Sequence, residues 1–396
     1  MSLSARYNCG FWYRMSRSIR FLVLLLLFVL AVEPAHAQIQ RSIPAAPSIA
    51  AKTWLLLDYQ TARVITGRDA DERIEPASLT KLMTAYVIFS ALKQGQLRLA
   101  QVVPVSQKAY KMSGSRMFIN PNRPVMVTEL LRGMMVESGN DATVALAESL
   151  AGSENEFVER MNNQAAHLGL TSTHFANATG LPDARHYSTA SDLSRLAVAV
   201  IRDYPEYFPI YSLRDYTYNG ITQRNRNELL FRDPFVDGIK TGYTEGAGYC
   251  LIATAKREGR RLLAVVVGAD SEGARAIEAQ KLLNYGFQYY ETIKLYSRDA
   301  PIADLPVWKG SEHELKAGFI EDFYVSVPRG QSGNLKAHLE TLQPLLAPIS
   351  LQQQVGVLRI TFADKPYGEF PVYALQPVAI ANMFVRAWHS IQLWFK

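Results

Sequence analysis

Cysteine is almost absent from this 396-residue chain, which contains only Cys9 and Cys250. A network of disulfides is therefore excluded as the source of stability, and the chain must rely on burying a large apolar core. Cys250 lies in the apolar run GYCLIATA, which predicts a buried, inert thiol.

The sequence also lacks a strong excess of charge of one sign. Its formal net charge is +6, and loss of residues 1–37 would remove four arginines and one glutamate and leave +3. Because the basic residues are not clustered, we do not expect nucleic acid as a partner.

Signatures of two common hydrolase classes are missing. There is no H-E-x-x-H motif, and His167, His174 and His186 lack the spacing of metal ligands, so we expect no metal site. There is no G-x-S-x-G motif either, so Ser-His-Asp chemistry finds no support.

The N-terminal apolar run FLVLLLLFVLAV is too short to span a membrane comfortably. Arginines precede it, and the small residues AHA at positions 35–37 suit a cleavage site. This pattern is typical of a secretory signal peptide at residues 1–37 and predicts export. The sequence leaves open whether the chain starts at Met1 or Met15.

The sequence does contain a helix-forming segment, EPASLTKLMTAYVIFSAL, with a serine and a lysine near its start. Apolar residues recur at helical spacing, Pro76 suits a first turn and Gly95 suits the stop. Ser78 and Lys81 should therefore share one face. Taken alone, such a pair is more often a capping serine beside a lysine that reaches water.

Strands are predicted on both sides of a helical middle. Alternating patterns predict strands at Thr53–Asp58 and Arg63–Gly67, and two further β-rich runs from Asp237 onward that join at Glu258-Gly259. Helices are predicted within 127–151, at 153–168, at 189–204 and at 271–290. This order predicts an α+β domain at residues 45–291, with an antiparallel sheet flanked by helices and closed by segments from both ends.

Two smaller units are predicted after this domain. Residues 292–376 contain short alternating runs separated by glycine and proline, which predict a small all-β domain. Residues 377–396 predict an amphipathic helix with three large aromatic residues beside basic ones. A helix lying in a membrane interface is favoured over one packed on its own protein.

Two further short motifs join the serine and lysine of the first helix. Ser138-Gly139-Asn140 lies 60 residues after Ser78, and Lys240-Thr241-Gly242 lies 162 residues after it. Each motif alone is weak. The order S-x-x-K, S-x-N and K-T-G in an exported chain is a much stronger signal, because each motif has the expected context of helix start, interhelical loop and strand.

With these motifs the sequence resembles the penicillin-recognising serine acyltransferases. It most closely resembles the low-molecular-mass penicillin-binding proteins that act as D-alanyl-D-alanine carboxypeptidases. The resemblance is dense from about Trp54 to Tyr290 and weaker across the β-rich part. It is carried by PASLTKLMTAYV, MMVESGNDA, FANATGLPD, STASDL and VDGIKTGYTEGAGYCLIATA. Tyr243 stands where some relatives have a histidine.

A serine hydroxyl is a poor nucleophile until a base takes its proton, and Lys81 can do this for Ser78 only when neutral. Burial and a nearby cation both lower the pKa of a lysine, and Lys240 is the candidate cation. The resemblance places a backbone N–H of Tyr243, next to Gly242, beside those of Ser78, where they would form an oxyanion hole.

The resemblance implies roles for the other motif residues. Ser138 would relay a proton between the lysines and the leaving amine, and Asn140 would donate a hydrogen bond to the peptide carbonyl of the substrate. Lys240 and Thr241 would help to hold the terminal carboxylate. The carboxylate-binding arginine of the family maps by position to Arg275.

The sequence therefore predicts a periplasmic serine-type D-Ala-D-Ala carboxypeptidase, attached to the outer face of the inner membrane by its C-terminal helix. It would remove the terminal D-alanine from peptidoglycan pentapeptide stems through an acyl-enzyme and so limit crosslinking. No metal or organic cofactor is expected, and β-lactams would be covalent inhibitors.

Three alternatives remain. A class A β-lactamase needs a glutamate to activate the deacylating water, and none occurs between Arg160 and Tyr204. A D,D-endopeptidase that cuts crosslinks would need no clamp for a free terminal carboxylate, so Arg275 argues against it. An inactive wall-binding scaffold would not need all three motifs intact.

Overall fold

The computed structural model describes residues 44–394, so the predicted signal peptide and the last two residues lie outside the described part of the chain. The elements up to residue 289 are β1 Thr53–Asp58, β2 Arg63–Arg68, η1 Ala77–Thr80, α2 Lys81–Lys93, β3 Val102–Val103, α3 Gln107–Tyr110, β4 Val125–Met126, α4 Val127–Val136, α5 Asn140–Ala151, α6 Glu154–His167, α7 Ala190–Asp203, η2 Phe208–Ser212, β5 Asp215–Tyr218, β6 Ile221–Arg224, α8 Leu229–Arg232, β7 Val236–Thr244, β8 Gly248–Arg257, β9 Arg260–Ala269 and α9 Glu272–Tyr289.

A five-stranded antiparallel sheet is the centre of residues 44–289. Its strand order is β2-β1-β9-β8-β7. The early strand β1 is buried along its whole length and pairs with the late strand β9, with Thr53 opposite Val267. The predicted α+β fold and the closure of the sheet by segments from both ends of the domain are thereby confirmed.

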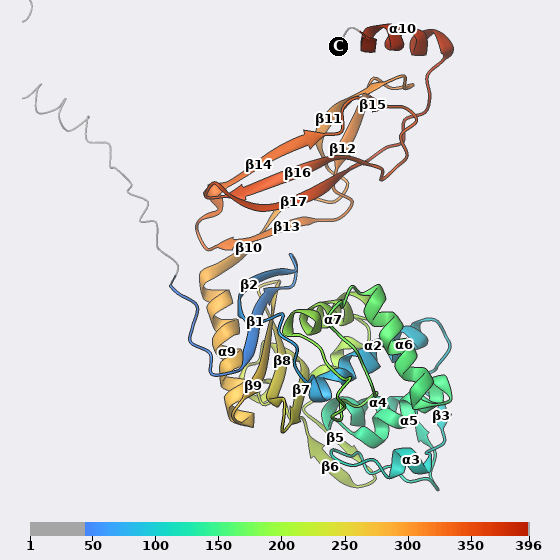
Figure 1. The fold of residues 1–396 in the computed structure, drawn as a ribbon, viewed down its shortest axis with the longest axis vertical. Coiled ribbons are helices and arrows are strands. Elements are labelled where there is room, and N and C mark those ends of the chain that lie inside the picture. Colours follow the sequence, from blue (N-terminus) through green and yellow to red (C-terminus); the bar gives the residue numbers. More distant parts are fainter. Residues whose placement is uncertain (1–43, 395–396) are drawn as a thin grey trace, which may run out of the picture. The chain divides into compact units, whose positions relative to one another are not determined.

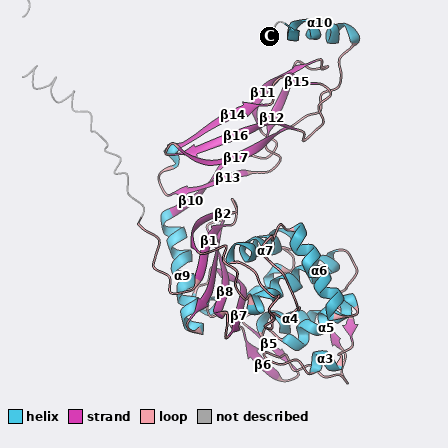
Figure 2. Cartoon of the chain, in the orientation of Figure 1, coloured by secondary structure: helices cyan, strands magenta, loops and turns pink. Residues whose placement is uncertain are grey.

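Helices cover both faces of this sheet (Figures 1 and 2). Helix α9 packs on β8 and β9, and the helical middle, with α2 at its centre, lies on the opposite face. Eleven of the thirteen residues of α2 are buried, because the helix is surrounded by α4, α5, α6 and α7. A helix in this position needs apolar residues on nearly all sides.

The start of α2 differs from the helix predicted to begin at Pro76. Residues Ala77–Thr80 form a 3₁₀ turn, and the α-helix begins only at Lys81. The turn is confined between two glycines. A Cβ on Gly180 would lie 1.8 Å from the Ala77 oxygen, and one on Gly242 would lie 3.2 Å from the Ser78 nitrogen. The approach at Gly180 leaves no room for a side chain, and a Cβ at Gly242 would fit only if the turn shifted by a few tenths of an ångström.

The strand region also differs from its prediction in one respect. The two β-rich runs predicted from Asp237 onward are three strands, because the chain reverses between β7 and β8 as well as between β8 and β9. At this additional turn the Ala247 N–H donates to Thr244 Oγ1 at 3.0 Å, and Gly248 adopts a φ of +69°. Glycine tolerates this left-handed conformation without steric cost.

Residues from Tyr290 onward form the predicted all-β part. Its elements are β10 Tyr290–Tyr296, β11 Pro301–Trp308, β12 Glu314–Gly318, β13 Phe323–Pro328, η3 Ser332–Asn334, β14 Leu335–Thr341, β15 Leu345–Leu346, β16 Gln354–Phe362 and β17 Lys365–Ala374. β10 pairs with β13, and the other strands form a sheet in the order β14-β16-β17-β12-β11-β15 around a separate apolar core.

The described chain ends in helix α10, Met383–Trp394. Its large apolar side chains are exposed, with Phe384 at 80% and Trp388 at 60%. His389 is buried instead, and its Nδ1 accepts a hydrogen bond from the Lys309 N–H at 2.7 Å. Among the helices of residues 44–394, none is both long and apolar enough to cross a membrane.

Candidate active site

The serine and lysine of the first motif are in direct contact. Lys81 Nζ donates a hydrogen bond to Ser78 Oγ at 2.9 Å. Ser78 is partly accessible in the turn η1, whereas Lys81 is fully buried as the first residue of α2. The two side chains therefore meet as the helical spacing predicted, and the lysine does not reach water.

The surroundings of Lys81 favour a neutral amine. Burial, together with the positive charge of Arg226, lowers the pKa of Lys81 to about 7, while Asp141 opposes this effect. The sequence-based prediction named Lys240 as the cation that acts on Lys81. In the structure the positive charge of Arg226 also acts on Lys81. Lys81 and Lys240 repel each other as well, and this repulsion contributes to the lowered pKa of Lys240.

Lys240 and Ser138 form a second lysine–serine pair. Lys240 Nζ donates to Ser138 Oγ at 2.9 Å and to the backbone oxygen of Thr241 at 3.0 Å. Burial, and then the positive charges of Lys81, Arg226 and Arg275, lower the pKa of Lys240 well below its usual value. Ser138 lies between α4 and α5 with a φ of 66°, a conformation that non-glycine residues seldom adopt.

Asn140, at the start of α5, connects Lys81 to a loop beside the site. Its Oδ1 accepts from Lys81 Nζ at 2.7 Å, and its Nδ2 donates to the Ser113 oxygen at 2.7 Å. Its backbone N–H donates to the Ser115 oxygen, also at 2.7 Å. The neighbouring Asp141 carboxylate accepts backbone N–H groups of residues 117–119 and so fixes the same loop.

These residues surround a pocket of about 190 Å³. Seven of the nine residues predicted for the site line this pocket: Ser78, Ser138, Asn140, Thr241, Gly242, Tyr243 and Arg275. The other two are the lysines, whose amines contact Ser78 and Ser138 in the pocket wall. The only carboxylate among the described lining residues is Glu272, and it is ion-paired with Arg275 at 3.4 Å. The pocket wall therefore carries an excess of positive charge.

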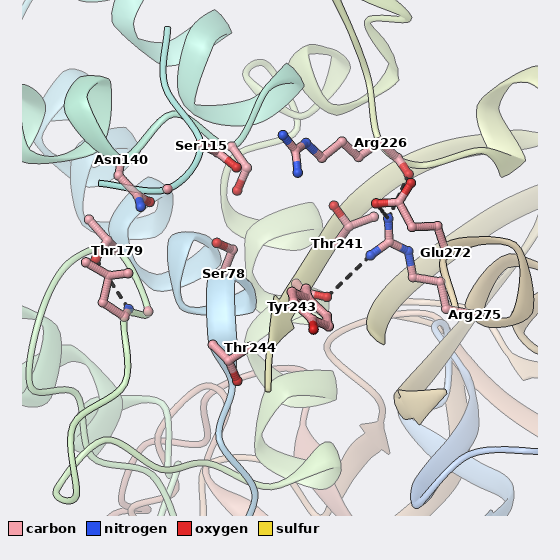
Figure 3. A pocket seen from close by; sticks show the side chains of 15 residues that line it. Ser78, Ser115, Asn140, Thr179, Arg226, Thr241, Tyr243, Thr244, Glu272 and Arg275 are labelled. Carbon is pink, nitrogen blue, oxygen red and sulfur yellow. Dashed lines mark hydrogen bonds and ion pairs between the residues drawn. The ribbon is translucent and has the colours of Figure 1, made fainter. Parts of the chain in front are cut away.

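Two arginines occupy one side of the pocket (Figure 3). Arg275, on α9, is 2% exposed and donates to the backbone oxygens of Gly242 and Arg226 at 3.4 and 3.2 Å. Arg226 extends its guanidinium toward Ser115 and forms an ion pair with Glu137 at 2.7 Å. Arg275 is thus a buried part of the pocket wall and not a solvated helix residue.

Strand β7 runs close to the turn η1, which carries Ser78. Gly242 lies against the Ser78 nitrogen, where a Cβ would be 3.2 Å away, and Tyr243 follows it in the lining of the pocket. The Tyr243 ring is half exposed and packs on Tyr249, with 4.4 Å between the ring centroids. The backbone of Tyr243 is thereby held beside η1 by strand pairing and by this ring contact.

Sequence reasoning missed several residues of the pocket. Arg226 lies in an irregular segment between β6 and α8, outside any motif, so no sequence signal pointed to it. The backbone oxygen of Thr179 accepts a hydrogen bond from Lys81 Nζ at 2.7 Å. Thr179 lies in the segment FANATGLPD, which contributed to the family resemblance but was given no role in the site. Ser115 and Thr244 complete the polar lining.

Cys250 is confirmed as a buried free thiol, and burial raises its pKa to about 11. Among residues 44–394, no group of histidine, cysteine or acidic side chains is arranged to hold a metal ion. The chemistry available in the pocket is thus a serine hydroxyl, two buried lysines and cationic binding groups.

Comparisons with known proteins agree with this geometry. The family profile described as D-alanyl-D-alanine carboxypeptidase matches residues 40–271, and the profile of the penicillin-binding protein 5 C-terminal domain matches residues 290–379. D-alanyl-D-alanine carboxypeptidase DacC of Escherichia coli K12 is 39% identical over 88% of this chain and 90% of its own length.

Solved structures are similar over the same range. Penicillin binding protein 5 from Haemophilus influenzae has a TM-score of 0.82 and 38% identity, covering 85% of this chain and 99% of that one. Penicillin-binding protein D2 from Listeria monocytogenes, solved in an ampicillin-bound form, has a TM-score of 0.57 and 30% identity over 62% of this chain and 100% of its own.

A serine enzyme is the class that this fold and pocket define. The chain belongs to the D-alanyl-D-alanine carboxypeptidase family. The family, the fold class and the serine-type carboxypeptidase activity predicted from the sequence are thereby confirmed.

Proposed function

We propose that Ser78 is the acylating nucleophile of this carboxypeptidase and that Lys81 is its general base. The observation that carries this proposal is the 2.9 Å contact between Lys81 Nζ and Ser78 Oγ at a lysine that is fully buried. Near neutral pH a substantial fraction of Lys81 is uncharged and can accept the serine proton. Ser78 then attacks the carbonyl of the penultimate D-alanine.

The tetrahedral oxygen would be stabilised by backbone N–H groups of Ser78 and Tyr243. The close approach of Gly242 to the Ser78 nitrogen supports this, because it places the two segments side by side. Backbone donors that are held in place before the reaction stabilise developing charge more effectively than mobile water does.

The leaving amine needs a proton, and the second lysine–serine pair is placed to supply it. Ser138 Oγ accepts from Lys240 Nζ at 2.9 Å and lines the same pocket as Ser78. We infer that the proton reaches the departing D-alanine through Ser138. Asn140 has one amide N–H left after its bond to Ser113, and this N–H would hold the peptide carbonyl.

The free terminal carboxylate of the pentapeptide would bind at the cationic side of the pocket. Thr241 offers a hydroxyl, and Arg226 and Arg275 supply positive charge. Lys240, whose pKa is lowered by burial and by these charges, lies beside Thr241 as a hydrogen-bond donor. Guanidinium groups bind carboxylates through paired N–H donors. This side of the pocket favours a substrate with a free terminus, and therefore carboxypeptidase over endopeptidase activity.

Pentapeptide muropeptide should lose one alanine on incubation with the protein, as measured by mass analysis, and prior exposure to penicillin should block the loss. The penicilloyl-enzyme should persist, because no glutamate occurs from Arg160 to Tyr204 and the one described carboxylate of the pocket is paired with Arg275. Rapid repeated turnover of penicillin would instead assign the protein to the β-lactamases.

We further propose that the protein is periplasmic and is held on the inner membrane by α10. The exposed apolar residues Met383, Phe384, Trp388, Ile391 and Trp394 support this proposal. Aromatic residues are favoured at the boundary between lipid headgroups and acyl chains, and Arg386 is exposed and available to lipid phosphates.

A chain that ends near Pro377 should lose membrane attachment but keep its activity on a small D-Ala-D-Ala peptide, because the described pocket residues all lie before position 276. Fractionation of cells expressing either the full-length or the truncated chain measures the attachment. Trp388→Ala serves as a milder variant, since one lost side chain removes only a few kcal/mol at about 25 cal/mol per Å². Equal recovery of both chains in the soluble fraction would rule out the anchor.

A further inference from the structure

Lys81 Nζ has three hydrogen-bond acceptors, which match the three N–H bonds of an ammonium group. They are Ser78 Oγ at 2.9 Å, Asn140 Oδ1 at 2.7 Å and the backbone oxygen of Thr179 at 2.7 Å. When the group loses its proton, it keeps two N–H bonds and gains one lone pair. The question is which acceptor the lone pair faces.

Only one of the three partners can change its role. The carbonyl oxygens of Asn140 and Thr179 accept hydrogen bonds and cannot donate them, whereas the Ser78 hydroxyl can do both. The two remaining N–H bonds therefore stay on the two carbonyls, because leaving a buried carbonyl unpaired is costly. The lone pair then faces the Ser78 hydroxyl, which is the geometry that proton transfer requires.

Asn140 belongs to a catalytic motif, but the Thr179 carbonyl comes from a turn that no motif explains. This turn is organised by Asn177. Asn177 Oδ1 accepts from the backbone N–H groups of Thr179, Gly180 and Leu181 at 3.1, 2.8 and 3.2 Å, and its Nδ2 donates to the Leu181 oxygen at 2.9 Å. One side chain thus closes the turn from both ends.

The turn is also fixed against the catalytic helix. Thr84 Oγ1, one turn along α2 from Lys81, donates to the Ala178 oxygen at 2.7 Å. The Ala178 N–H donates to Glu154 Oε1 at 3.0 Å. Gly180 has a φ of +86° and lies against Ala77, in the nucleophile turn. These contacts set the position of the Thr179 oxygen relative to Lys81.

We propose that Asn177 is a positioning residue for acylation, because its side chain holds the Thr179 carbonyl at the place where it directs the Lys81 lone pair toward Ser78. The proposal rests on the proposed roles of Ser78 and Lys81. It assigns to the segment FANATGLPD a function in orienting the base, in addition to its structural role.

Asn177→Ala is expected to slow acylation of Ser78 by a fluorescent penicillin about 10- to 100-fold in the full-length chain, since a misoriented reacting group costs roughly this much. The pH at which acylation is half-maximal should move upward, because water that enters beside Lys81 relieves the burial that lowers its pKa. A variant that is only less stable would lose rate in proportion to its folded fraction and keep the same midpoint.

Asn177→Asp provides a rescue variant. A carboxylate oxygen can accept the same three backbone N–H groups, so the rate at high pH should recover well above that of Asn177→Ala. The added negative charge stabilises the Lys81 ammonium, so the midpoint should still lie above that of the unchanged chain. Recovery at high pH separates orientation of the base from its protonation.

Asn162→Ala is the matched control. Like Asn177, Asn162 is half-buried and bonds the backbone of the same segment through both amide atoms, accepting from the Phe175 N–H and donating to the Phe175 oxygen, each at 2.9 Å. It does not touch the turn that carries Thr179. Its acylation rate per folded molecule and its pH midpoint should match those of the unchanged chain.

The proposal is overturned if Asn177→Ala acylates at the normal rate with an unchanged midpoint, or if its loss equals that of Asn162→Ala. Failure of the underlying catalytic assignment gives a different result, because the unchanged chain would then carry the fluorescent label at a residue other than Ser78. Peptide mapping of the labelled protein distinguishes the two.

Discussion

Ser78→Ala is expected to abolish both penicillin labelling and D-alanine release. In the proposed mechanism the hydroxyl oxygen forms the acyl-enzyme, and loss of a nucleophile in enzymes of this kind lowers kcat by about 10⁴-fold or more. The fold should remain, because the hydroxyl makes no capping contact in η1 and its hydrogen bond with Lys81 is worth only about 1 kcal/mol. Lys81 keeps two carbonyl acceptors, which satisfy the two N–H bonds of a neutral amine.

Labelling with fluorescent penicillin and release of D-alanine from a pentapeptide measure this prediction, and thermal unfolding checks the fold. Ser90→Ala is a suitable control, because Ser90 lies in α2 and its hydroxyl accepts a hydrogen bond from the exposed Gln94 side chain. Labelling that persists in Ser78→Ala would show that another residue is the nucleophile.

Lys81→Arg should reduce acylation nearly as strongly as removal of the amine, by about 10³-fold or more. A guanidinium stays protonated at any pH at which the protein is folded, so it cannot accept the proton of Ser78. The site is also fully buried and is shaped for a single nitrogen within 2.9 Å of three oxygens. The larger planar group cannot reproduce these contacts.

Because burying a permanent charge can unfold the protein, Lys81→Met is the second variant. Its neutral side chain has nearly the same length, and we expect a folded protein that is equally inactive. Lys93→Arg is the control at the other end of α2, where Nζ is exposed and donates to the Asp203 oxygen. Substantial acylation by folded Lys81→Arg at neutral pH would place the base elsewhere.

The unchanged chain should acylate faster as the pH rises through about 7. The reactive form of Lys81 is the neutral one, and its pKa is lowered to about 7, so the neutral fraction is small below this pH and nearly complete above it. Lys81→Met and Lys81→Arg should lose this dependence together with the rate. The pH profile therefore tests whether the group that titrates is the group that accepts the proton.

Local patterns in the sequence correctly predicted much of the fold. The strand at Thr53–Asp58 matches in its bounds, and the helix predicted at 189–204 is α7, which Thr189 caps by accepting from the Asp192 N–H. Helix α6 likewise begins after Ser153. Such elements are set by alternation, helical periodicity and capping within about one or two turns of chain, so a single segment is enough to reveal them.

The errors in the predicted fold have a common cause in packing. The helix expected from Pro76 begins as a 3₁₀ turn at the place where Gly180 and Gly242 lie against it from segments distant in the sequence. The amphipathic pattern at the C-terminus correctly predicted a helix, but not that His389 on its polar side packs on the β-rich part. Neither contact can be predicted from the local periodicity of the sequence.

The sequence by itself determined the chemistry of this protein: the serine, the two lysines, the asparagine, and the order of the motifs that indicated the family. The tertiary structure alone decided the pKa values and the orientation of these groups. It places the Thr179 oxygen in hydrogen-bond contact with Lys81, 98 residues away in the sequence, and pairs Arg226 with Glu137, 89 residues away. Burial and charge act through space, so the pKa of Lys81 and the direction of its lone pair depend on residues that no spacing along the chain could identify.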